Sequence, residues 1–172
     1  MKRRTEILIG LLCILIAGLL IPQHFTMPVE NASAKDYNQQ SFWYYPWGKS
    51  GTHKGVDIFA KKGTNLNAST SGLILYTGKI KMGGKIVIIL GPKWRIHYYA
   101  HLDEITASFG WTNRNDKIGT VGDSGNAKGK PPHVHYSIVT LLPYVWRIDT
   151  GPQGWKKMFY LNPITYLKTE SE

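Results

Sequence analysis

Two histidines two positions apart are the residues of this sequence best suited to chemistry. His133 and His135 lie in the segment Pro131-Pro132-His133-Val134-His135-Tyr136-Ser137, whose Val and Tyr residues are typical of a β-strand. Alternate residues of a strand point to the same face, so both imidazoles would project together, about 6.5–7 Å apart. One ring could then bind a metal ion while the other transfers a proton. Taken alone, the pair fits two unrelated histidines on one strand face equally well.

A second group of suitable residue types lies upstream. The segment Gly51-Thr52-His53-Lys54-Gly55-Val56-Asp57-Ile58-Phe59 contains His53 and Asp57, and a strand is expected to begin near Gly55. The even separation of His53 and Asp57 would turn both side chains to one side of an extended chain. Imidazole nitrogens and carboxylate oxygens are ligands for Zn²⁺. The same pair also fits a solvated loop histidine and an aspartate that caps a turn.

A third segment, Arg95 to Leu102, predicts another strand with two more histidines. Strict alternation places His97, Tyr99 and His101 on one face and Ile96, Tyr98 and Ala100 on the other. His101 comes at the end of the strand, just before a loop, and is well placed to line a cleft. His97 is interpreted as a partly buried or rim histidine.

The elements that must position these residues are predicted to be mostly strands. The chain has 172 residues, 42% of them hydrophobic, with 18 Gly and 9 Pro. Short apolar runs bounded by glycine, such as 72–77 and 85–90, are typical of core strands, and helical periodicity is scarce after residue 35. The length accommodates one domain with its own core and a short extension. These features predict a mostly β domain with many turns.

The N-terminal segment has the pattern of an export signal. A basic start, Met1-Lys2-Arg3-Arg4, is followed by an uninterrupted apolar run over residues 7–21, and Ala32-Ser33-Ala34 resembles a cleavage site. The pattern fits a cleaved signal peptide or an N-terminal membrane anchor, and both place the rest of the chain outside the cytoplasm, in the periplasm or cell envelope. Residues 1–34 are therefore expected to be signal or anchor with linker, and residues 35–172 the domain, with a folded core of about 42–167. The apolar run is thus the one candidate for contact with a membrane.

The charge of the chain suggests an anionic partner. The net charge is +10, which fits nucleic acid, a membrane surface or an acidic cell-wall polymer. Export favours the wall polymer, and a nucleic-acid-binding barrel would leave the His and Asp residues unexplained. Cys13, the single cysteine, excludes an internal disulfide, and Leu12 before it argues against a lipid anchor.

Four motifs in order carry a resemblance to a known family. They are His53-Lys54-Gly55-Val56-Asp57, Tyr99-Ala100-His101-Leu102, the glycine-rich run 119–125, and His133-Val134-His135-Tyr136. Together they resemble the lysostaphin/LytM-type zinc metallopeptidases over about residues 42–167. The resemblance implies a small antiparallel β-sheet domain with a zinc groove, acting as a peptidoglycan endopeptidase. An arginine often found near the domain entry in that family has no evident counterpart, although Lys49 is close by.

The resemblance also implies a role for each site residue. His53, Asp57 and His135 would bind one Zn²⁺ per chain, leaving a fourth position for water. His101 and His133 would be the catalytic pair that handles protons and stabilises the oxyanion. The alternative is an exported, non-catalytic peptidoglycan-binding or regulatory domain that activates another wall hydrolase. All five positions are filled, which favours the enzyme. Which peptide bond is cut and the oligomeric state stay open, with a monomer as the default expectation.

Overall fold

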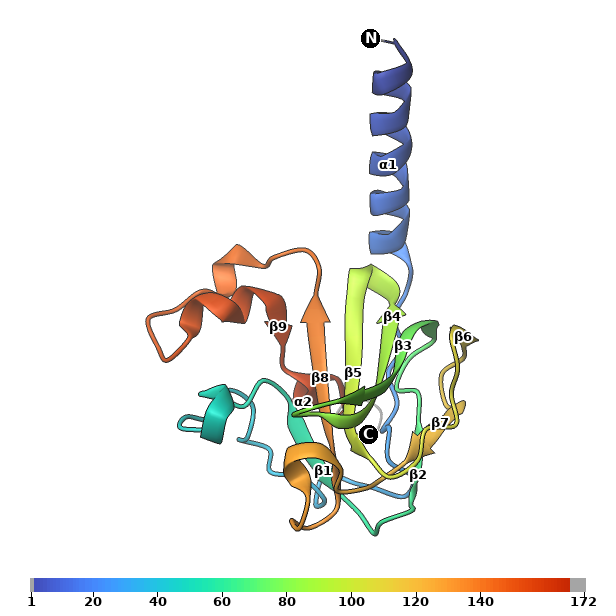
Figure 1. The fold of residues 1–172 in the computed structure, drawn as a ribbon. Helices are drawn as coiled ribbons and strands as arrows, with labels where there is room; N and C mark the ends of the chain where they lie inside the picture. Colours follow the sequence, from blue (N-terminus) through green and yellow to red (C-terminus); the bar gives the residue numbers. More distant parts are fainter. Residues whose placement is uncertain (1, 168–172) are drawn as a thin grey trace.

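A computed structural model describes residues 2–167 of the chain, and it confirms the predicted mostly β architecture (Figure 1). Seven strands form one antiparallel sheet in the order β1-β8-β5-β4-β3-β6, with β9 added alongside β8, and β2 and β7 form a separate two-stranded sheet. The helices are α1 (Lys2–Leu20) and α2 (Pro163–Leu167). The strands are β1 (Val56–Phe59), β2 (Asn65–Asn67), β3 (Gly72–Ile80), β4 (Gly84–Gly91), β5 (Arg95–Leu102), β6 (Gly110–Thr112), β7 (Lys117–Thr120), β8 (His133–Thr140) and β9 (Tyr160–Leu161).

The two faces of the large sheet have different environments, as the alternation of side chains along β8 shows. Val134, Tyr136 and Ile138 are fully buried in the hydrophobic core. The intervening residues, His133, His135, Ser137 and Val139, line a cavity on the opposite face. One face of the sheet is therefore the core of the domain, and the other is the floor of a cavity.

The segment between α1 and the sheet belongs to the core, a contribution that its polar composition did not indicate. Phe25, Val29 and Tyr37 are buried in the same cluster as the strand residues, and Phe25 stacks on Tyr166 with ring centroids 4.5 Å apart. Val29 forms a β-bridge with Leu66 of β2. Residues 25–37 therefore pack as part of the domain, because the side chains of Phe25, Val29 and Tyr37 point into the core.

Helix α1 projects away from the sheet and meets it near the turn between β4 and β5 (Figure 1). There the indole N–H of Trp94 donates a hydrogen bond to the Leu15 carbonyl oxygen, with 2.8 Å between the two atoms. Its side chains are largely exposed, and none is buried. Across residues 2–167, no helix combines the length and apolarity needed to cross a membrane.

Candidate metal centre and active site

Strand pairing places Asp57 and His135 next to each other. In the antiparallel ladder of β1 and β8, Asp57 lies directly opposite His135, and Phe59 lies opposite His133. Directly opposed residues have side chains on the same face, so the carboxylate and the imidazole meet. The distance from Asp57 Oδ1 to His135 Nδ1 is 2.8 Å. Gly55 also allows this approach, because a Cβ there would lie 2.9 Å from His135 Cε1.

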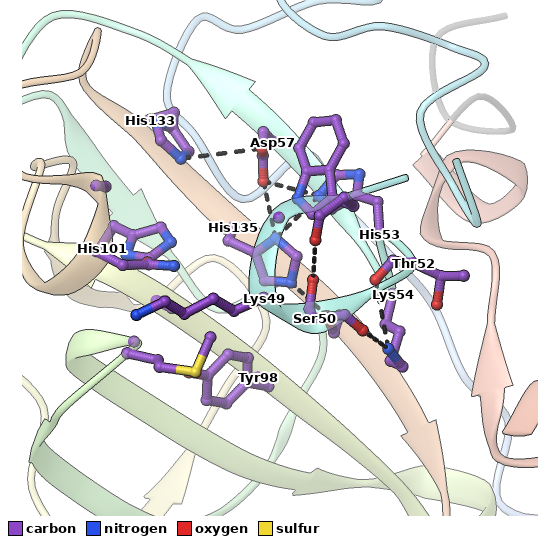
Figure 2. Close-up of a pocket in the computed structure, with 18 of the residues that line it drawn as sticks. Lys49, Ser50, Thr52, His53, Lys54, Asp57, Tyr98, His101, His133 and His135 are labelled. Carbon is purple, nitrogen blue, oxygen red and sulfur yellow. Dashed lines mark hydrogen bonds and ion pairs between the residues drawn. The ribbon is translucent and has the colours of Figure 1, made fainter. Parts of the chain in front are cut away.

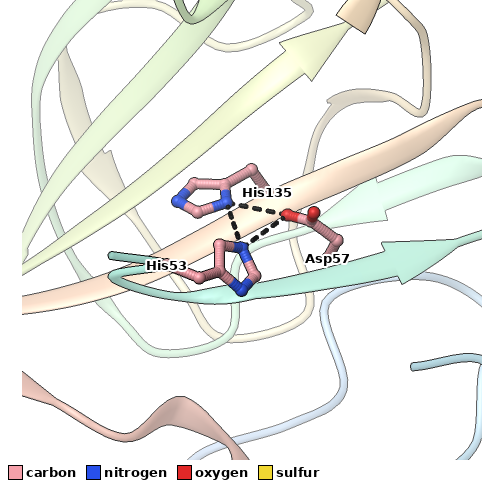
Figure 3. Close-up of side chains that lie close together, drawn as sticks. All are labelled: His53, Asp57 and His135. Carbon is pink, nitrogen blue, oxygen red and sulfur yellow. Dashed lines mark hydrogen bonds and ion pairs between the residues drawn. The ribbon is translucent and has the colours of Figure 1, made fainter. Parts of the chain in front are cut away.

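His53 reaches the same place from the loop before β1. Its backbone N–H donates to the Tyr44 carbonyl at 3.0 Å, and its own carbonyl accepts from the Trp43 N–H at 2.7 Å. The ring is fully buried and stacks on Trp47, with centroids 4.1 Å apart. His53 Nε2 lies 3.0 Å from Asp57 Oδ1 and 3.1 Å from His135 Nδ1 (Figure 3). One atom from each of the three residues thus converges on a single point.

The donors and acceptors around this point fit a cation. His53 Nδ1 lies 3.0 Å from the Ser41 carbonyl oxygen, which can only accept, so we assign the proton of the neutral ring to Nδ1. Its Nε2 lone pair then faces a carboxylate oxygen, an arrangement that is repulsive unless a proton or cation lies between them. His135 can be oriented likewise, because its Nε2 lies 2.9 Å from the Ser137 hydroxyl oxygen and can donate to it.

The spacing of the three atoms is also appropriate for zinc. Ligand atoms about 2.0–2.1 Å from a tetrahedral ion lie about 3.3 Å from one another. The separations here are 2.8, 3.0 and 3.1 Å, slightly closer than that. His53, Asp57 and His135 are the one group of metal-ligating side chains that the described residues bring together in this way. The outer nitrogen of His53 bonds to the Ser41 carbonyl and that of His135 to the Ser137 hydroxyl, as the second ring nitrogen of a metal-binding histidine typically does.

His133 and His101 lie beside this group, and each ring bonds to the backbone through Nδ1 and not through Nε2. His133 Nδ1 donates to the Pro131 carbonyl at 2.8 Å, and His101 Nδ1 donates to the Ser124 carbonyl at 2.9 Å. Each neutral ring therefore carries its lone pair on Nε2. The His133 Nε2 atom is 3.9 Å from Asp57 Oδ2, and the two rings are 5.1 Å apart (Figure 2).

The predicted alternation along β5 is wrong at His101. Ile96, Tyr98 and Ala100 line the cavity, as alternate residues should, while His97 and Tyr99 are completely buried in the opposite face. His101 nevertheless lines the cavity with the first set. Its φ of 69° places the backbone in the left-handed region, which ends the alternation and redirects the side chain. His101 and His97 therefore have opposite environments, although both have odd numbers in the same strand.

Burial and neighbouring groups shift two pKa values in the site. Burial by itself would raise the pKa of Asp57, but the close ring nitrogens of His135 and His53 hold it well below its ordinary value. Burial lowers the pKa of His101 to about 4, and the nearby His133 contributes to the same shift. At neutral pH His101 is therefore uncharged and able to accept a proton.

All five sequence-predicted residues line one cavity of about 770 Å³ (Figure 2). Sequence reasoning did not identify Trp47, which covers the His53 ring, or Ser137, which holds His135. Ser137 could have been found from the same alternation that pairs His133 with His135. Trp47 could not, because its contact depends on the path of the loop before His53.

Residues 51–145 match the sequence model of Peptidase family M23, and the chain belongs to that family. The L-Ala–D-Glu endopeptidase of Bacillus subtilis is 31% identical over 149 residues, which are 79% of this chain and 44% of that enzyme. The DD-carboxypeptidase/endopeptidase Mpg of Neisseria meningitidis is 34% identical over 84 residues, 49% of this chain and 19% of that protein. This chain thus spans less than half the length of either relative.

A solved structure shares the fold. The catalytic domain of lysostaphin from Staphylococcus simulans superposes with a TM-score of 0.61 at 24% identity, covering 80% of this chain and 99% of that domain. The resemblance in sequence to lysostaphin-type peptidases is thereby matched by a shared antiparallel architecture.

Proposed function

We propose that this protein is a zinc-dependent endopeptidase that hydrolyses amide bonds in the peptide stems or cross-bridges of peptidoglycan. The observation that carries the proposal is the convergence of His53 Nε2, Asp57 Oδ1 and His135 Nδ1 within 3.1 Å, beside two histidines with available Nε2 atoms. Membership of a peptidase family supports it, as does the name of the Bacillus relative.

In this proposal His53, Asp57 and His135 hold one Zn²⁺. The bound ion would supply Lewis-acid polarisation of the scissile carbonyl and would lower the pKa of a water molecule. The Nε2 lone pair of His133 or His101 accepts a proton from the attacking water. The protonated ring then donates that proton to the leaving amine or stabilises the oxyanion. The carbonyls of Pro131 and Ser124 keep both rings in the orientation that these transfers require.

The location that follows from this substrate is outside the cytoplasm. The basic start and apolar run of residues 2–21 support export, and a peptidoglycan substrate requires it. The regulatory alternative has no comparable support, because such a domain would not need a complete set of three ligands and two proton carriers.

The test is digestion of purified peptidoglycan by the full chain loaded with one equivalent of zinc. Mass spectrometry of the released fragments should find new amine and carboxylate ends at one type of peptide bond. The matched control is the Asp57→Asn protein, which should release none. A folded, zinc-loaded protein that cleaves no wall of any cross-link chemistry would overturn the proposal.

A further inference from the structure

The walls of the cavity carry positive charge that the proposed metal centre does not use. Three lysines, Lys49, Lys54 and Lys130, are among the residues that line it. Asp57 is the one carboxylate among the described lining residues, and it is committed to His53 and His135. Away from that centre, the cavity therefore offers cations and no compensating anion.

Lys49 and Lys130 approach the cavity from different segments. Lys49 lies in the short turn Gly48–Ser50, and its side chain extends across the opening toward His101 (Figure 2). Lys130 directly precedes Pro131, whose carbonyl holds His133. Among residues 2–167, neither lysine forms an ion pair with a carboxylate. Two ammonium groups with no carboxylate partner among the described residues thus belong to the cavity that holds the two proposed proton carriers.

Lys54 adds a third cation at the edge of the cavity. Its ammonium donates to the Ser50 carbonyl at 2.9 Å and the Thr52 carbonyl at 3.3 Å, so neutral oxygens hold it in place. An anion bound in the cavity would be attracted to this third cation, whereas a neutral ligand would not.

We propose that this cavity selects peptides with free carboxylates close to the scissile bond, and that Lys49 and Lys130 are the residues that recognise them. The inference rests on the proposed endopeptidase function and narrows its substrate to acidic stem peptides. A neutral glycine bridge offers no side-chain carboxylate, so it would leave the lysines unpaired. Charge complementarity of this kind steers encounter and favours one substrate over its uncharged analogue.

The experiment compares two synthetic stem peptides of one sequence, one with free carboxylates and one with every carboxylate amidated. With the full, zinc-loaded chain, kcat/KM for the acidic peptide should exceed that for the amidated peptide by about 10-fold, the effect of one charged hydrogen bond. The variants Lys49→Gln and Lys130→Gln should each reduce this ratio, because kcat/KM for the acidic peptide should fall more than kcat/KM for the amidated peptide. Lys93→Gln, in the turn between β4 and β5, is the matched control and should keep the ratio. Raising the salt concentration should also reduce it.

The outcomes separate the inference from the function on which it rests. Equal cleavage of both peptides would overturn the substrate preference and leave the endopeptidase intact. If neither peptide nor whole peptidoglycan is cleaved, the endopeptidase fails, and equilibrium binding of the same two peptides decides the inference. A binding preference for the acidic peptide that Lys49→Gln and Lys130→Gln abolish would support it, and equal affinities would overturn it.

Discussion

Asp57 and His135 face each other across the β1–β8 ladder, with Oδ1 of the carboxylate 2.8 Å from Nδ1 of the imidazole. A register shift of one residue in this ladder would turn Asp57 to the opposite face and separate the two groups. The antiparallel pairing of β1 and β8 therefore fixes the positions of Asp57 and His135 relative to each other.

The first prediction concerns the charge of Asp57. Asp57→Asn keeps the size of the side chain but removes the negative charge that balances a divalent ion. We expect zinc affinity to fall by about 100-fold or more, and activity with it. Zinc content after dialysis, measured by elemental mass spectrometry, checks this. Asp103→Asn, at a partly exposed carboxylate paired with Lys62, is the control and should retain zinc. Stoichiometric zinc in Asp57→Asn would contradict the assignment of Asp57 as a ligand.

The second prediction separates His101 and His133 from the three proposed ligands. Replacing either by Ala should lower kcat by about 10²–10⁴-fold, the usual contribution of a general acid or base. Zinc content should be nearly unchanged, because neither Nε2 belongs to the converging group. Paired measurements of kcat and bound zinc test this, with His24→Ala, at an exposed position, as the control. Loss of zinc in the His101 or His133 variant would show that the residue is a ligand instead.

The third prediction concerns the segment between α1 and the sheet. Phe25 and Val29 are 6% and 1% exposed, and the side chain of Gln23 bonds to His97 and Arg95. A chain that starts at residue 35 lacks all three, so it should lose several kcal/mol of stability, since each large apolar side chain contributes about 2–5 kcal/mol. Thermal unfolding should show a Tm at least about 10 °C below that of a chain that starts at residue 22.

A point substitution tests the same contact without changing chain length. Val29→Ala in the full chain should cost about 1–3 kcal/mol, because its side chain is fully buried against Leu66 and the core. Ala34→Ser, in the exposed stretch that follows, is the control.

Equal Tm values for the chains that start at 22 and 35 would mean that residues 22–34 contribute nothing to the fold.

The fourth prediction concerns His97, which is completely buried. Its Nδ1 lies 2.7 Å from the Tyr136 hydroxyl and its Nε2 lies 2.9 Å from the Gln23 amide nitrogen. Burial, aided by the charge of Arg95, lowers the pKa of His97 to about 3. Between about pH 6.5 and 3 the unfolded chain binds a proton at this position and the folded chain does not, so stability falls as the pH falls.

From pH 7 to pH 5, the loss from His97 should be about 2 kcal/mol, because one pKa unit corresponds to about 1.4 kcal/mol. Urea unfolding at the two pH values measures it. His101, whose pKa is also lowered, adds a loss of the same sign, so the comparison must be between wild type and His97→Gln. The variant should lose less stability over this interval. An identical loss in both proteins would mean that His97 does not titrate in this way.

Local patterns in the sequence predicted the five strands β1, β3, β4, β5 and β8 but not β2, β6, β7 or β9, and the roles of the site residues were implied by the family resemblance. Alternation along residues 133–139 places His133 and His135 on one face, and the structure agrees because β8 is regular and one of its faces is buried. The same alternation was wrong at His101, since a positive φ there redirects the side chain although β5 continues to Leu102. The alternation of side chains assumes extended backbone dihedral angles at every residue, and a single residue in the left-handed region does not meet that assumption.

The sequence by itself determined which residue types were present, their order along the chain and the faces of the regular strands. Only the tertiary structure decided which carbonyl holds each ring, that His97 is buried beneath Gln23, and that residues 25–37 complete the core. These features depend on contacts between segments far apart in the chain, such as Ser41 with His53 and Val29 with Leu66. Local propensity carries no information about such contacts, because they arise only when the segments pack together.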